Sequence, residues 1–198
     1  MTRLIVITLA LGVLTGPLLP QGVVAVLGDV TTIALGVMLF CVGVDLGRNR
    51  QILACLRSQG LATLVIPLLI AVGSIGGAVI FGLLVNFPLP QAMAVGSAFG
   101  WYSLVGPMLA EVHSPKLGAI AFLANALREF ISLLIIPMIA KYCGPWSAIA
   151  PSGAAAMDVT LPVVARTTSP ENSILAFLSG AVLSVLVPII LPLIIQLL

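Results

Sequence analysis

Long apolar runs separated by short polar clusters cover the whole chain. A helix needs roughly 20 apolar residues to cross the hydrocarbon core of a bilayer, and the alternating pattern of barrel strands is absent. We therefore predict an all-α integral membrane protein with about seven transmembrane helices, forming a single domain over residues 1–198. The predicted spans are Leu4–Leu19, Val30–Val44, Leu61–Val85, Gln91–Ala110, Leu117–Ala140, Ser147–Ala165 and Ile174–Leu198.

The sixth predicted span carries signals that break a helix. Pro151 and Pro162 each remove a backbone donor and clash with the preceding turn, and Gly153 and Asp158 lie between them. Broken helices at membrane depth usually line a cavity or a binding site. We expect a broken helix around Pro151–Pro162.

The composition excludes a soluble enzyme. Hydrophobic residues make up 61% of the chain and charged residues 7%, with a mean hydropathy of +1.27, whereas soluble domains carry about 25% charged residues. Common catalytic motifs of hydrolases, zinc proteases and P-loop enzymes are missing. The three cysteines have no metal-ligand spacing. We expect no catalysis, no metal and no cofactor.

Lysine and arginine positions predict the orientation in the membrane. The densest basic cluster follows the second span, and the positive-inside rule puts it in the cytoplasm. With seven spans, the N-terminus is then cytoplasmic, the C-terminus is outside, and Lys141 is the exception on the outer side. The basic residues expected in the cytoplasm are Arg3, Arg48, Arg50, Arg57, Lys116 and Arg166.

Ionisable residues lie inside two predicted spans. Arg128 and Glu129 fall at the centre of the fifth span, where a charge costs about 2.5–3.5 kcal/mol. Neighbouring helical residues point about 100° apart, so we expect these two side chains to find partners on other helices. The sequence leaves open whether they fix packing or carry function. Asn125 shares the face of Glu129, and Asp158, beside unwound backbone, can coordinate a cation or hold a proton.

Two aromatic residues lie in mid-span rather than at a membrane interface. Trp101 and Tyr102 precede Ser103 within the fourth predicted span. They either line the same cavity as the carboxylates or pack in the protein interior, and the pattern does not decide between the two.

Three motifs occur in order along the chain: Phe99-Gly100-Trp101-Tyr102-Ser103-Leu104, Leu127-Arg128-Glu129, and the run GAAAMDVTLP from Gly153 to Pro162. Together they resemble the lysine exporter (LysO) family of prokaryotic inner membranes, over nearly the whole chain. The resemblance implies export of L-lysine and its toxic analogues from the cytoplasm through the inner membrane, by antiport with protons. It also implies that Glu129 and Asp158 lie in the translocation pathway. The residues expected to bind substrate or protons are Glu129, Asp158, Arg128, Asn125, Trp101, Tyr102, Ser103 and Thr160.

The chain departs from the family pattern in two respects. Ala155 and Ala156 stand where many members have hydroxyl residues, which removes side-chain ligands at those positions. Longer members also carry about three further spans before the region matching this chain. Because a core of two equal inverted repeats needs an even number of spans, seven spans predict a homo-oligomer or a small membrane partner subunit.

Two functions of other classes compete with lysine export. One is a monovalent-cation/proton antiporter, with Na⁺ as a possible coupling ion. The other is a non-transporting membrane subunit that stabilises a partner. GxxxG spacings such as Gly73/Gly77 and Gly96/Gly100 offer contact surfaces for such a partner.

Overall fold

The computed structural model describes residues 64–198, together with isolated positions between residues 15 and 44. The backbone divides into two compact units, Met1–Phe40 and Cys41–Leu198, and every helix discussed below belongs to the second. Apart from the isolated positions, the first two predicted spans lie outside the described residues. So does the basic cluster from Arg48 to Arg57.

Within residues 64–198, three helices are long and apolar enough to cross a membrane. They are α4 (Val65–Leu84), α7 (Pro115–Tyr142) and α9 (Pro170–Ile195). At 1.5 Å per residue their lengths are about 30, 42 and 39 Å, against a hydrocarbon core of about 30 Å. They confirm the third, fifth and seventh predicted spans and a helical, multi-pass membrane protein.

The other two predicted spans are each divided into two short helices. The first pair is α5 (Leu89–Gly96) and α6 (Tyr102–Val112), and the second is the 3-10 helix η3 (Ser147–Met157) followed by α8 (Leu161–Thr167). The expected break around Pro151–Pro162 is therefore confirmed. The prediction of one continuous helix over Gln91–Ala110 is wrong, because Phe99 and Gly100 turn the chain with φ of 49° and 99°.

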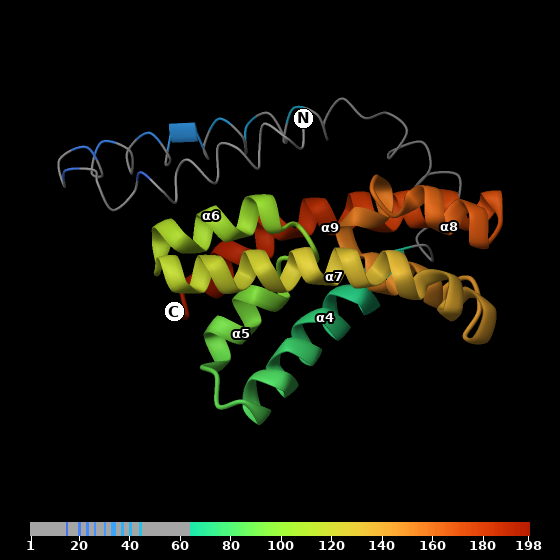
Figure 1. The fold of residues 1–198 in the computed structure, drawn as a ribbon, viewed down its shortest axis with the longest axis horizontal. Helices are drawn as coiled ribbons and strands as arrows, with labels where there is room; N and C mark the ends of the chain where they lie inside the picture. The colour runs from blue at the N-terminus through green and yellow to red at the C-terminus, as the bar shows by residue number, and fades with distance from the viewer. Residues whose placement is uncertain are drawn as a thin grey trace. The chain divides into compact units, whose positions relative to one another are not determined.

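The α5–α6 segment enters the protein and returns to the same end. The ring of Tyr102 packs edge-on against Phe122 at 5.2 Å, and four residues later Gly106 packs against the backbone of Gly118. Because the residue numbers rise along α6 as they fall along α7, these two helices are antiparallel. Figure 1 shows α5 running towards the middle of α7 and α6 running back. The segment is therefore a re-entrant hairpin.

The η3–α8 segment forms a second re-entrant hairpin from the opposite end. Its η3 arm starts just after α7 ends, and by Ala150 and Pro151 it has reached Arg128 in the middle of α7. In Figure 1, α8 then leads back to the end where α9 begins. Gly180 lets α9 pass close to the tip, since a Cβ there would meet Ala154 and Met157.

The tips of the two hairpins meet in the interior. The Ala154 amide donates a hydrogen bond of 2.8 Å to the Phe99 carbonyl. Gly153 makes this contact possible, because a Cβ at that position would collide with the same carbonyl. Each hairpin follows a long helix, α4 or α7, that runs in the opposite direction to the other, so residues 65–167 form an inverted repeat of one span plus one hairpin.

This repeat changes the predicted topology in two ways. Lys141 and Arg166 end α7 and α8 at the same end of the protein, whereas Lys116 begins α7 at the other end. The prediction that Arg166 shares a side with Lys116 is therefore wrong, whereas Lys141 lies opposite Lys116 as predicted. The partner was predicted because two equal inverted repeats need an even number of spans. That reasoning no longer applies, because each repeat contains a hairpin in place of a second span. The partner itself stays a prediction.

We expect Gly153→Ala to destabilise the protein. Gly153 has φ 59° and ψ −131°, a conformation that costs other residues about 1–3 kcal/mol, and the new methyl group would press on the Phe99 carbonyl. Thermal unfolding in detergent measures the loss. Gly77→Ala is the control, because a Cβ at Gly77 meets no atom within 4 Å. If both variants unfold at the wild-type temperature, the tips do not pack as described.

Candidate functional site

Asn125, on α7, holds the tip of the first hairpin. Its Oδ1 accepts a hydrogen bond of 2.9 Å from the Gly100 amide. Its Nδ2 donates to the Val95 carbonyl at 3.1 Å and to the Ala121 carbonyl at 3.0 Å. The side chain is 4% exposed. Asn125 therefore satisfies backbone groups in the α5 arm and in the tip of this hairpin, where α5 has ended and α6 has not begun.

Arg128, one turn further along α7, holds the second hairpin. Its Nε donates to the Pro151 carbonyl at 2.9 Å and its Nη2 to the Ala150 carbonyl at 3.4 Å. Its Nη1 donates to the Ser74 hydroxyl at 2.9 Å, and that hydroxyl donates to the Gly96 carbonyl at 2.8 Å. Arg128 thus connects α7, α4 and both hairpins. The prediction of partners on other helices is confirmed for Arg128.

Ser132 completes this row on α7. Its hydroxyl lies 2.6 Å from the Arg128 carbonyl and 2.8 Å from the Pro151 carbonyl. Since a hydroxyl has one proton to donate, it serves one of these two acceptors at a time. Gly153 has non-helical φ and ψ and so interrupts η3 two residues after Pro151, and the Pro151 carbonyl is bound by side chains of α7.

Glu129 points to a different side of α7, into a cavity of about 130 Å³ beside the hairpin tips. Asp158 lines the same cavity from the end of η3, where its Oδ1 accepts a 2.6 Å hydrogen bond from the Val159 amide. The cavity thus brings together two carboxylates that are 29 positions apart in the sequence. The other residues that line it are Gly100, Trp101, Tyr102, Ser103, Ala154, Ala155, Met157, Val159 and Ser184.

Five of the eight predicted site residues share this cavity: Glu129, Asp158, Trp101, Tyr102 and Ser103. Asn125 and Arg128 instead bind the backbone of the two tips. Thr160 is fully buried, and its Oγ1 donates to the Ala155 carbonyl at 3.0 Å.

Ser184 was not among the residues predicted from the amino-acid pattern. It reaches the cavity from α9, and its hydroxyl is bound to the Gly180 carbonyl at 2.9 Å. Ser74, which links Arg128 to the first hairpin, was also not selected. For Ser184 and for Ser74, the one feature of the sequence that could have indicated a role is a hydroxyl residue within an otherwise apolar helix.

The cavity combines negative side chains with a positive helix end. The side chains of Glu129 and Asp158 are acidic, while α6 begins at Tyr102 with its first turn at the cavity. The first N–H groups of a helix have no partner within it, and the helix dipole favours an anion there. Such a cavity suits a small molecule that carries both cationic and anionic groups.

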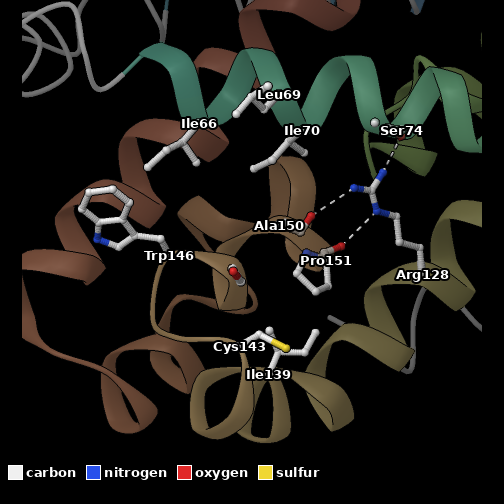
Figure 2. Close-up of a pocket in the computed structure, with 12 residues that line it drawn as sticks. Ile66, Leu69, Ile70, Ser74, Arg128, Ile139, Cys143, Trp146, Ala150 and Pro151 are labelled. Carbon is white, nitrogen blue, oxygen red and sulfur yellow. Dashed lines mark hydrogen bonds between the residues drawn. The ribbon is translucent and has the colours of Figure 1, made fainter.

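A second, larger cavity of about 760 Å³ lies between α4, α7 and η3. Arg128 lines it together with Ser74, Trp146 and several apolar residues (Figure 2). Glu129 and Asp158 are not among its lining residues. Neighbouring residues of α7 therefore face two different cavities, as their 100° separation on a helix requires.

Comparison with known proteins gives the family. The family model described as Lysine exporter LysO matches residues 6–195. The chain belongs to this family. The lysine exporter LysO of Escherichia coli (strain K12) is 35% identical over 155 residues, which are 77% of this chain and 50% of that protein. A Haemophilus influenzae protein named "Putative lysine exporter" is 33% identical over 158 residues, 78% of each chain.

The chain spans about half the length of its Escherichia coli relative. No solved structure matches it significantly. Family membership agrees with the resemblance carried by the three motifs, and all three contribute residues to the meeting point of the hairpins.

We expect Asn125→Leu to lower the stability of the folded protein. Leucine is chosen because its side chain is close in size to that of asparagine. The substitution leaves the Gly100 amide and the Val95 carbonyl without their partner, and each unsatisfied buried group costs about 1–3 kcal/mol. Thermal unfolding in detergent measures the loss. Leu134→Ala, at a position 61% exposed on the same helix, is the control. A larger loss for Leu134→Ala than for Asn125→Leu would contradict a tip-holding role.

Proposed function

We propose that this chain exports L-lysine from the cytoplasm, with Glu129 and Asp158 as the residues that bind its ammonium groups. The observation that carries the proposal is the cavity at the hairpin tips, which collects these two carboxylates from separate elements. The names of the relatives, which describe lysine exporters, support the choice of substrate. Discontinuous helices that meet at mid-membrane are the usual place of a transporter's substrate site.

The chemistry of lysine fits this cavity group by group. Its two ammonium groups need acceptors, and carboxylates form the strongest hydrogen bonds to such donors. Its carboxylate needs donors, which the first turn of α6 supplies near Tyr102 and Ser103. The ring of Trp101 adds a surface that attracts cations.

The proposed direction of transport rests on the basic residues. Lys141 and Arg166 lie at one end of the protein, and Arg57 precedes α4, which starts at that end, by only a few residues in the sequence. The positive-inside rule favours the cytoplasm for this end. In a prokaryotic inner membrane, α9 then ends on the outer side.

We also propose that protons drive export. Two carboxylates that bind the ammonium groups of lysine can bind protons in their place, so one site serves both cargoes in turn. A monovalent cation in place of lysine is the alternative that the same pair of carboxylates allows.

Asp158→Asn should reduce lysine efflux from proteoliposomes at least tenfold, because the amide cannot offer the negative charge that an ammonium group needs. Labelled lysine measures the rate, and detergent unfolding confirms that the variant is folded. Glu171→Gln is the matched control, since Glu171 is an exposed carboxylate outside the cavity. Efflux at the wild-type rate by a folded Asp158→Asn protein would refute the proposed site.

A proton gradient directed into the compartment that holds lysine should accelerate its efflux. The Glu129→Gln and Asp158→Asn proteins should lose this acceleration, because proton binding requires their carboxylates. Lysine flux at several imposed pH gradients measures the effect. Indifference to pH together with a response to a sodium gradient would replace protons by Na⁺ as the coupling ion.

A further inference from the structure

The larger cavity is open and mostly apolar, with a charged side chain at one end. It extends from Arg128, at the middle of α7, to Cys143 and Trp146, where α7 ends and η3 begins. Figure 2 shows Trp146 and Arg128 at opposite sides, with Ile66 and Ile70 of α4 between them. Its volume of about 760 Å³ falls within the range of small-molecule sites, about 300–1,000 Å³.

The charge of Arg128 is not neutralised by a carboxylate in the described part of the chain. All of its described acceptors are neutral: two backbone carbonyls and the Ser74 hydroxyl. A guanidinium has five N–H donors, and these three bonds use three of them. Among the described residues that line the cavity, Arg128 is the one that carries a charge. It therefore offers an unpaired positive charge and spare donors to a ligand.

The walls between Arg128 and Trp146 suit an aliphatic chain. Ile66, Leu69 and Ile70 line one side along α4, and Ile139 lines the side of α7. Methylene groups gain free energy when they leave water for such a surface. At the end opposite Arg128, Trp146 is 64% exposed, and an indole face attracts ammonium groups.

The geometry points to a second binding site in this cavity, for an amino acid whose side chain ends in an ammonium group. The carboxylate of the ligand binds Arg128, its methylene groups lie along α4, and its terminal ammonium group faces Trp146. The choice of lysine as ligand rests on the proposed function. The site itself is separate from the Glu129 and Asp158 cavity and lies on another face of α7.

The Trp146 end of this cavity lies at the end of the protein that carries Lys141 and Arg166. Under the proposed function, the positive-inside rule assigns that end to the cytoplasm, where lysine to be exported is found.

The two tryptophans of the chain allow the two cavities to be observed separately. Trp101 lines the small cavity and Trp146 the large one. In a purified Trp101→Phe protein, the remaining fluorescence reports on Trp146. Titration with lysine should produce a saturable change in emission. The same titration with 1,5-diaminopentane, which has both ammonium groups but no carboxylate, should give at least tenfold weaker binding, because Arg128 recognises the carboxylate.

Glycines of α4 provide a matched pair of variants in this background. Gly73 lines the large cavity with open space around its Cβ position, so Gly73→Leu fills the cavity and leaves the hydrogen bonds of Arg128 intact. Gly77 is equally unobstructed but does not line it. Gly73→Leu should weaken lysine binding at Trp146 at least tenfold, and Gly77→Leu should leave it within twofold. Arg128→Gln should also weaken it at least tenfold.

Adding Asp158→Asn separates this inference from the proposed function. That variant should lose export and keep the Trp146 response to lysine, because the two cavities are distinct. Absence of a saturable response, equal binding of 1,5-diaminopentane, or an unchanged response in Gly73→Leu would each overturn the second site. Failure of the wild-type chain to export lysine, with the Trp146 response retained in the Trp101→Phe protein, would count against the proposed function alone.

Discussion

A polypeptide that breaks its helices inside a membrane must find new partners for the backbone groups that it frees, because lipid offers none. In this protein α7 supplies them for both hairpins. Asn125 binds the amide of Gly100 in the first tip, and Arg128 binds the carbonyls of Ala150 and Pro151 beside the second. Without these bonds, neither tip would hold its shape, and the cavities beside them would lose their walls.

The position of Arg128 explains how a charge is tolerated at this depth. A central arginine costs about 2.5–3.5 kcal/mol on insertion scales, and hydrogen bonds to a charged group return about 1.5–3 kcal/mol each. Three such bonds offset the insertion cost and join α4, α7 and η3. Glu129, the next residue, is turned by about 100° and faces the other cavity. One helical step therefore separates an acidic cavity from a cationic one.

Much of the candidate site was predictable, because its residues are polar or aromatic in an apolar chain. Glu129 and Asp158 were selected by their charge at mid-span, and Trp101 and Tyr102 by their depth, and all four line one cavity. Arg128 was predicted for the same site but lines the larger cavity instead. Which cavity each face of α7 meets could not be predicted from periodicity, because the packing around a helix is not known from its sequence. Ser184 was missed for the same reason, because a serine in a hydrophobic helix gives no indication of what it faces.

Apolar length and proline chemistry act locally, so the amino-acid pattern was enough to predict a helical membrane chain with a break between Pro151 and Pro162. It did not determine the direction of the chain after a break. Residues 89–112 contain enough apolar residues for one span, yet they form two arms that enter and return. Hydropathy measures the apolar length of a segment. It has the same value whether the segment crosses the membrane once or enters it and returns. Only the tertiary contacts of Gly100, Phe99 and Ala154 decide between them, because they hold the turn at mid-membrane.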